Sequence, residues 1–440
     1  EEMLTISTHV EYHGEIIPIT EGIRQEVLAE VGQLNRQGLR VLGVGYKSGL
    51  REDYAYAVTD ESDMILTGYL AFLDPPKPSA APAIQALLEH GVRTKILTGD
   101  NEKVTQAICE KVGLDVEQML LGADIDQMTD QELAEAVESV TVFAKLSPDQ
   151  KARIILQLKK NGHAVGYMGD GINDAPSMKV ADVGISVDTA VDIAKETADV
   201  ILLDKDLMVL ETGIVEGRKV YANMTKYIKM TVSSNFGNIF SLLVASIFLP
   251  FLPMAPVHLI VLNLVYDLSC VALPFDNVDQ DFLKQPHTWE AKSITRFMVW
   301  MGPISSIFDI LTFIFLYFII VPLVTGYHYV HGSESALQFI ILFQTGWFIE
   351  SMWSQTMVIH MLRTAKVPFV QSRPAWLVIL TTLVAAIFVT SLPYGALAGV
   401  LRLAPLGIPY FLFLALIIFL YMISVTTIKN FYIKKYKEWL

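Results

Sequence analysis

Hydrophobic and polar positions follow two patterns along the 440 residues, and the change between them lies near Lys226. Before that point, short apolar runs alternate with stretches of helical spacing, as in parallel strands joined by helices. After it, long apolar segments follow one another, each near the ~20 residues that a membrane-spanning helix needs. We therefore expect an α/β region followed by an all-α membrane region.

The α/β region divides into a small domain and a larger one. Residues 1–65 look like the end of the small domain, and its expected elements are strands at 16–19 and 40–46 and a helix at 23–37. From 78 to about 217, strands and helices alternate, which favours a parallel sheet with its functional groups at the carboxyl ends of the strands. The strands expected there are 94–97, 140–143, 163–168, 183–186 and 200–203.

Six apolar segments are expected to span a membrane, at about 227–250, 257–275, 297–322, 338–359, 375–393 and 408–428. Lysine and arginine gather after the second and fourth segments and in the tail, whereas the opposite connections hold only Arg402. These basic residues are Lys284, Lys292, Arg296, Arg363, Lys366, Arg373, Lys429, Lys434, Lys435 and Lys437. The positive-inside rule then places residues 1–225 and the C-terminus in the cytoplasm.

Charge and composition support the same division. Residues 1–225 hold 20 Lys/Arg and 37 Asp/Glu, whereas residues 226–440 hold 13 and 9. The first half has no basic patch interleaved with aromatic residues, so we do not expect nucleic acid as a partner. Cys109 and Cys270 have no metal-site spacing and fit a reducing cytosol.

The stretch from Met168 to Pro176 carries the densest chemistry. It follows the expected strand 163–168 and holds Asp170 and Asp174 four residues apart, with Asn173 between them. Gly169 and Gly171 allow a tight turn there. Two carboxylates at the end of a parallel strand can hold a hard cation beside a phosphate. A glycine-rich turn that caps the next helix is an equally good interpretation of these nine residues alone.

Two other strand ends carry polar groups. Thr98, Gly99 and Asp100 follow the strand at 94–97 and precede a helix, where a hydroxyl and backbone N–H groups can hold a phosphate. Lys151 lies one turn into the helix that Ser147 can cap, where it can serve as a point charge on a phosphate. Each also has an ordinary interpretation, a helix cap and a surface lysine.

Taken together, the three stretches resemble the last three motifs of the haloacid dehalogenase superfamily. The wording Thr-Gly-Asp-Asn (98–101), Lys-Leu-Ser-Pro-Asp-Gln-Lys (145–151) and Gly-Asp-Gly-Ile-Asn-Asp-Ala-Pro (169–176) is similar to the phosphorylation domain of P-type ATPases. The resemblance implies an α/β haloacid dehalogenase-like, Rossmann-like cytosolic domain joined to an all-α bundle of six transmembrane helices. It implies that Asp170 and Asp174 form the catalytic Mg²⁺ site, that Lys151 and Thr98 contact the phosphoryl group, and that Gly99, Asp100 and Asn173 complete the site.

The family's motif with the phosphorylated aspartate, Asp-Lys-Thr-Gly-Thr, does not occur in the 440 residues, nor does Thr-Gly-Glu. We therefore expect the chain to be the C-terminal portion of a longer pump, with the N-terminal portion as a partner. In family terms, residues 1–65 would be the end of the nucleotide-binding domain, 66–225 the rest of the phosphorylation domain with its stalk, and 226–440 the membrane domain. Most of the ATP pocket would then lie upstream.

Polar residues inside the apolar segments are candidates for an ion path, because a charge in mid-membrane is costly. Asn263 and Asp267 lie one helical turn apart in the second segment, beside Tyr266, and Asn235 and Asn238 share a face of the first. Asp309 and Glu350 lie in the third and fourth segments, where they can serve the ion or only helix association.

The runs Ser-Ser-Asn-Phe-Gly-Asn (233–238), Asn-Leu-Val-Tyr-Asp (263–267) and Pro-Phe-Asp-Asn-Val-Asp (274–279) resemble bacterial magnesium-transporting P-type ATPases. The resemblance implies ATP hydrolysis through an aspartyl-phosphate and Mg²⁺ import, with ATP, Mg²⁺ and membrane lipid as partners. The calcium pumps of the superfamily, which place a glutamate where Asn238 stands, are the nearest alternative. A membrane-anchored phosphatase and a carrier with a regulatory phosphate-binding domain are more distant ones.

Overall fold

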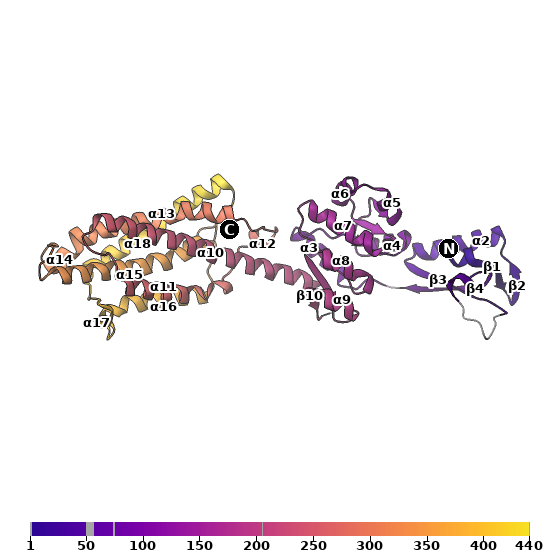
Figure 1. Cartoon of the computed structure of the whole chain (residues 1–440), viewed down its shortest axis with the longest axis horizontal. Coiled ribbons are helices and arrows are strands. Elements are labelled where there is room, and N and C mark those ends of the chain that lie inside the picture. Colours follow the sequence, from indigo (N-terminus) through magenta and orange to yellow (C-terminus); the bar gives the residue numbers. More distant parts are fainter. Residues whose placement is uncertain (1, 50–56, 74, 205, 440) are drawn as a thin grey trace. The chain divides into compact units, whose positions relative to one another are not determined.

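The computed structural model describes residues 2–49, 57–73, 75–204 and 206–439. The chain forms two compact units, Glu1–Gly213 and Ile214–Leu440, and each is described by itself (Figure 1). The expected boundary after residue 225 falls inside helix α10 (Met208–Phe248), twelve residues beyond the division between the units.

Unit 1 begins with a small sheet. In the described residues its strands are β1 (Ser7–Tyr12), β2 (Glu15–Pro18), β3 (Leu39–Tyr46) and β4 (Met64–Leu73), in the order β2-β1-β4-β3. Helices α1 (Glu2–Ile6) and α2 (Glu21–Arg36) accompany it, and Leu4, Val10 and Leu66 form its core. The boundary expected after residue 65 falls inside β4, which pairs with both β1 and β3.

The rest of unit 1 alternates strand and helix, as expected. Its described strands form two parallel sheets of three, β10-β9-β8 and β5-β7-β6, instead of the single sheet that the alternation suggests. The strands are β5 (Ile96–Leu97), β6 (Met119–Leu121), β7 (Val142–Ala144), β8 (Gly166–Met168), β9 (Val183–Val187) and β10 (Val200–Leu202). Leu97 and Val165 pack against both apolar clusters of this region, so one continuous core supports the two sheets.

Short helices connect these strands. They are α3 (Ala80–Glu89), α4 (Glu102–Lys111), α5 (Gly122–Gln127), α6 (Asp130–Ser139), α7 (Pro148–Lys160), the 3₁₀ turn η2 (Ile172–Asp174), α8 (Ala175–Val180) and α9 (Asp192–Thr197). The carboxyl ends of β5 and β8 lead directly to the polar stretches at Thr98 and Asp170.

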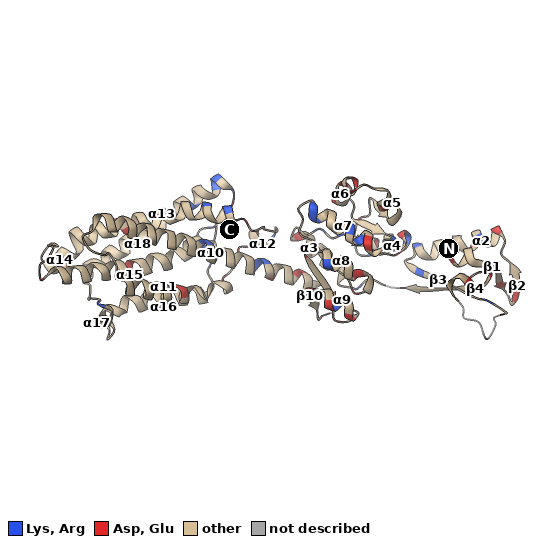
Figure 2. Cartoon of the chain, in the orientation of Figure 1, with Lys and Arg blue, Asp and Glu red and all other residues tan. Residues whose placement is uncertain are grey.

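Unit 2 is a helical bundle with few charged residues in its long helices (Figure 2). Besides α10, its long helices are α11 (Pro256–Cys270), α13 (Ala291–Phe315), α15 (Ala336–Leu362), α16 (Trp376–Ser391) and α18 (Ile408–Tyr436). Shorter pieces are η3 (Leu273–Phe275), α12 (Gln280–Leu283), the π-helical turn η4 (Leu316–Ile320), α14 (Val321–Thr325), η5 (Leu392–Tyr394) and α17 (Ala398–Leu401). Within the described ranges, five helices are long and apolar enough to cross a membrane.

Helix α15, expected as the fourth of six spans, is not among those five, although it has 27 residues. It carries Gln344, Glu350 and Gln355, and nearly all its side chains from Phe339 onward are buried. The helices α11, α13, α16 and α18 pack around it. Because its neighbours are protein, α15 can carry polar side chains that a lipid-facing helix cannot.

Candidate functional site

The stretch after β8 is held by a close backbone approach at Gly169. Its N–H donates to the Ile185 carbonyl of β9 at 3.1 Å, and its own carbonyl accepts from the Ser186 hydroxyl at 2.9 Å. A Cβ at this position would overlap the side chain of Asp174. Glycine is therefore required at 169 by the position of that carboxylate.

Asp174 receives hydrogen bonds from three directions. Its Oδ1 accepts from the Lys151 ammonium at 2.8 Å and from the Tyr167 hydroxyl at 2.7 Å, and its Oδ2 accepts from the Gly171 N–H at 3.3 Å. Lys151 and Tyr167 are buried. We expected Asp174 as a direct Mg²⁺ ligand, but its described contacts make it the partner of the lysine.

The charges at this pair are set by opposing effects. Burial alone would raise the pKa of Asp174, but the bonds from Lys151 and Tyr167 and the lysine charge outweigh it, so the pKa lies below its usual value. Burial and the adjacent carboxylate raise the pKa of Tyr167, so its hydroxyl stays a donor. Asp174 is therefore a carboxylate at neutral pH.

Helix α7 delivers Lys151 through its capping box. Ser147 Oγ accepts from the Gln150 N–H at 3.3 Å, and the Gln150 side chain accepts from the Ser147 N–H at 2.9 Å, with Pro148 in the first turn. The cap and the early proline were both expected. They fix where the first turn begins and so place Lys151 beside Asp174.

The stretch after β5 forms a second polar turn. Thr98 Oγ1 accepts from the Asp100 N–H at 3.1 Å, and Asn101 caps α4 through the Lys103 N–H at 2.8 Å. Gly99 is exposed, and the Asp100 carboxylate pairs with Arg40 at 2.8 Å. No hydrogen bond or ion pair joins Thr98 or Asp100 to Lys151 or Asp174 among the residues described.

Asp170 and Asn173 are exposed beside this pair. The backbone carbonyl of Asp170 accepts from the Val191 N–H at 3.2 Å, whereas its carboxylate has no hydrogen-bond partner in the described part of the chain. A free carboxylate at a strand end, next to a paired lysine, fits the oxygen ligands that Mg²⁺ prefers. No group of three or more His, Cys, Asp and Glu side chains that could hold a metal occurs among the described residues.

In unit 2, three of the candidate ion residues lie on the surface of the bundle. Asn235 on α10 and Asn263 and Asp267 on α11 are exposed, Asn238 is half-buried, and Tyr266 is buried. In the described residues no hydrogen bond joins one of these side chains to another. The structure therefore places them on two consecutive helices but does not assemble them into a closed site.

Asp309 and Glu350 are buried in the bundle. Asp309 accepts hydrogen bonds from the Ser241 hydroxyl at 2.6 Å and the Trp347 indole N–H at 2.9 Å, which join α10, α13 and α15. Glu350 is 1% exposed, and one of its oxygens has no partner among the described residues. These contacts favour helix association for Asp309 and leave the ion interpretation of Glu350 open.

Several contacting residues were missed from the sequence. In the sequence Tyr167 is one residue of an expected apolar strand, and its place directly before Met168, Gly169 and Asp170 is the only signal of its role. Arg363 and Lys429 were counted as loop and tail charges, yet both are buried and bonded inside the bundle. Both lie near the ends of apolar segments, where basic side chains are usually exposed.

Residues 7–182 match the family model described as haloacid dehalogenase-like hydrolase, and residues 251–431 match that of cation transporting ATPase, C-terminus. The chain is 49% identical over 436 residues to the magnesium-transporting ATPase, P-type 1, of Salmonella typhimurium strain LT2, which is 99% of this chain and 47% of that protein. The Escherichia coli K12 protein of that name is 48% identical over the same shares. Calcium-transporting ATPase 1 of Bacillus cereus is 31% identical over 71% of this chain and 36% of that protein.

The two family matches define the class: a haloacid dehalogenase-like domain in one chain with the C-terminal membrane region of a cation-transporting ATPase. The similarity along nearly the whole chain agrees with the motifs at Thr98, Lys151 and Asp170. The chain belongs to the P-type ATPase family. It spans about half the length of the magnesium-transporting relatives that it matches.

Proposed function

We propose that this chain is the C-terminal portion of an ATP-driven Mg²⁺ transporter that works through an aspartyl-phosphate and imports Mg²⁺ into the cytoplasm. The observation that carries the proposal is the Lys151–Asp174 pair at the end of β8, in one chain with membrane helices that bear Asp267. A phosphoryl-transfer site linked to an intramembrane carboxylate is what an ion pump requires.

Each residue of the phosphorylation site has a proposed part. Asp170 would hold the catalytic Mg²⁺, which lowers the negative charge of the phosphoryl oxygens when bound. Lys151, oriented by Asp174, would offset charge on the phosphoryl group, and the Thr98 hydroxyl and the Gly99 N–H would donate to it, with the Asp100 N–H holding the Thr98 hydroxyl in place. Asn173, exposed beside them, would complete the polar surroundings.

The two small sheets support an additional strand between them. Among the described strands, β8 and β5 are edges, although their neighbours share one core. A strand from the other half of the full-length protein would pair with both and bring a phosphorylated aspartate to the ends that carry Asp170 and Thr98. Most of the ATP pocket would come from the same half.

For the membrane unit we propose six spans, with α15 as the fourth, in a bacterial plasma membrane. Residues 1–225 and the C-terminus would be cytoplasmic, as the distribution of lysine and arginine suggests. Asp267 would be the charged ligand of the transported ion, and Asn235, Asn238, Asn263 and Tyr266 would supply neutral oxygens. Glu350 would contribute from α15 only if its unpartnered oxygen reaches the path.

The Ca²⁺ pump is the second candidate. It is supported by identity of 31–33% to calcium-transporting ATPases over 64–71% of this chain. The higher identity to the magnesium-transporting proteins favours Mg²⁺. A phosphatase with a passive anchor gives no reason for Asp267 in a membrane helix.

The test is phosphoenzyme formation by the full-length protein with γ-labelled ATP. Asp170→Asn and Lys151→Ala should each remove most of the acid-stable label, because the first loses a metal ligand and the second a charge on the phosphoryl group. Matched controls are Asp192→Asn, which is 93% exposed and pairs with Lys195, and Lys159→Ala on the same helix α7. Labelling of Asp170→Asn and Lys151→Ala at the wild-type level would refute the site.

A further inference from the structure

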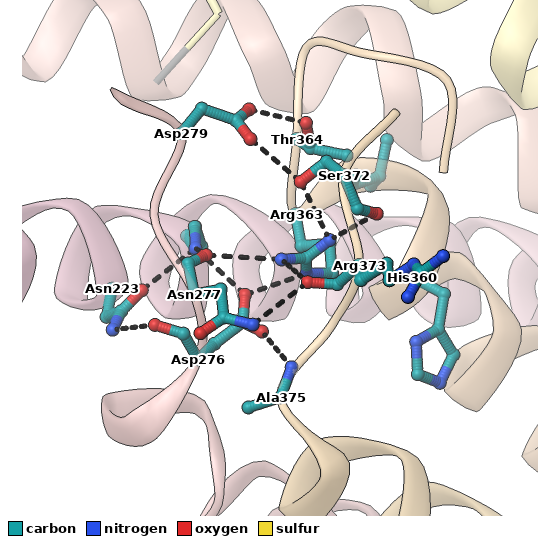
Figure 3. A network of polar contacts seen from close by, with 12 residues as sticks. Asn223, Asp276, Asn277, Asp279, His360, Arg363, Thr364, Ser372, Arg373 and Ala375 are labelled. Carbon is teal, nitrogen blue, oxygen red and sulfur yellow. Dashed lines mark hydrogen bonds and ion pairs between the residues drawn. The ribbon is translucent and has the colours of Figure 1, made fainter. Parts of the chain in front are cut away.

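The polar cluster around Asp276 joins four segments of the membrane unit (Figure 3). Asp276 follows η3 directly, and its Oδ2 accepts from the Lys226 ammonium of α10 at 2.9 Å and from Arg363 Nε at the end of α15 at 2.8 Å. Its Oδ1 accepts at 3.1 Å from the N–H of Ala375, the N-cap residue of α16. One carboxylate therefore ties α10, α15 and α16 to the segment that follows α11.

Both cations in this cluster use all their donors. Lys226 also donates to Asn223 Oδ1 and the Asn277 carbonyl, each at 2.9 Å. The terminal nitrogens of Arg363 reach the carbonyls of Ser372, Arg373 and Asn277, each at 3.1 Å. Lys226 and Arg363 are 1% exposed, so the geometry is fully determined by protein groups.

The candidate ion ligands form two rows, one on α10 and one on α11, and the cluster is separated from each row by the same number of residues. Lys226 precedes Asn235 by nine residues on α10, and Asp276 follows Asp267 by nine residues after α11. At 1.5 Å per residue, the nine residues of α10 extend roughly 13 Å, whereas the second interval leaves α11 at Cys270 and passes through the turn η3. Helices α10 and α11 are consecutive and are joined by the short segment 249–255, so they run in opposite directions. The cluster therefore fixes how far along the bundle the candidate ligands of one helix lie relative to those of the other.

We infer that Lys226, Asp276 and Arg363 are positioning residues for ion transport, which hold the ligand rows of α10 and α11 in register. The inference rests on the proposed function. A buried ion pair is a weak source of net stability, since apolar side chains of similar volume often replace one without loss, whereas its directional bonds can fix register. The three residues do not contact the ion; they act through the helices that carry Asn235 and Asp267.

The experiment measures Mg²⁺ uptake by the full-length protein in cells without other Mg²⁺ uptake systems, as a function of external Mg²⁺. Lys226→Met keeps the length of the side chain and leaves Arg363 and Asp276 as a balanced pair. It should raise KM for external Mg²⁺ by up to about 100-fold, the loss that a small misplacement of the binding groups can cause, and leave the maximal rate nearly unchanged. Lys226→Arg should restore most of the affinity.

Lys229→Met is the matched control. Lys229 lies on the same helix, is 2% exposed, and donates to the Trp439 carbonyl at 2.9 Å instead of to Asp276. It should keep the wild-type KM. If Lys226→Met does not accumulate in the membrane, Asn223→Ala decides, because it removes the bonds to the Pro274 and Asp276 carbonyls without a change of charge, and it should raise KM in the same direction.

A wild-type KM in Lys226→Met, or an equal rise of KM in Lys229→Met, would overturn this inference but leave the proposed function standing. Wild-type cells that take up no Mg²⁺ would overturn the proposed function and this inference with it.

Discussion

At the scale of single residues, Asp174 is held by Lys151, Tyr167 and Gly171 in the proposed phosphoryl site. It is partly buried, a hydrogen-bonded ammonium compensates its charge, and a glycine makes the room that its side chain needs. These are separate physical demands on separate residues. Each can be removed by one substitution.

The first prediction concerns Lys151→Met and pH. In the wild type the pKa of Asp174 lies below its usual value of 3.8, so its stabilising contribution is complete above that pH and is lost as the pH falls through the lowered pKa. Without the lysine, burial opposes the charged form, and we expect a loss of about 1.5–3 kcal/mol at pH 7. The loss should shrink as the pH falls below 4.

The measurement is thermal unfolding of the purified chain between pH 2.5 and 7, with Lys195→Met as the control, because its partner Asp192 is 93% exposed. A difference between wild type and Lys151→Met that is constant across this range would contradict the prediction.

The second prediction compares two glycines of the same turn. Gly169→Ala should destabilise unit 1 by about 1–3 kcal/mol, because its Cβ would overlap Asp174. Gly171→Ala should change the unfolding free energy by less than about 0.5 kcal/mol, since its φ of −102° suits alanine and its nearest contact is at 3.5 Å. Denaturant unfolding of both variants tests this, and equal losses would show that Asp174 is not the cause.

Contacts of single residues could be predicted where they depend only on the neighbouring sequence. The capping box at Ser147 and the lysine one turn later depend only on neighbours in the chain. The bond from Tyr167 to Asp174 could not be predicted, because the pattern of an apolar run says that a side chain is buried but not where its hydroxyl points. The burial of Lys226 and Arg363 could not be predicted for a related reason, since a charge near the end of an apolar segment usually lies at the membrane surface.

At the scale of elements, most strands and helices of the α/β region lie within a few residues of their expected positions. The strand β6 was not expected, because three residues carry too little periodicity. The single expected sheet is two sheets, since alternation predicts parallel strands without their order. Helix α15 was expected from its length and remains a proposed span, because its polar side chains are buried among neighbouring helices instead of facing lipid.

The third prediction tests α15 as a span. Glu334 and Gln371 are exposed and flank this helix, so single cysteines there report on its two ends. In intact cells, Glu334→Cys should react with an impermeant thiol reagent and Gln371→Cys only after permeabilisation, because the positive-inside rule places the Arg363 end in the cytoplasm. Equal reactivity of both positions before permeabilisation would mean that α15 does not cross.

At the scale of the whole molecule, the surfaces of the two units suit different surroundings, water for unit 1 and lipid for unit 2. Unit 1 separates polar surface from an apolar core, whereas the long helices of unit 2 place leucine and phenylalanine outward, as a lipid environment allows. Composition alone predicted this division. It could not predict that Asn235, Asn263 and Asp267 are exposed on the bundle, because exposure depends on which helices pack there.

The last prediction concerns transport by the full-length protein. Asp267 is exposed, and its carboxylate has no hydrogen-bond partner in the described residues, so Asp267→Asn removes a charge without breaking a contact and should leave the protein folded. If Asp267 is the charged ligand, Mg²⁺ uptake should fall to background. Asp281→Asn, the same change at a carboxylate that pairs with Lys366 beyond the membrane helices, should keep uptake.

Asn238→Glu adds the carboxylate that the calcium pumps carry and should raise Ca²⁺ uptake relative to Mg²⁺. Uptake assays with both ions decide the matter: normal Mg²⁺ uptake by Asp267→Asn would refute the ion site, and Ca²⁺ uptake by the wild type in preference to Mg²⁺ would favour the calcium pump.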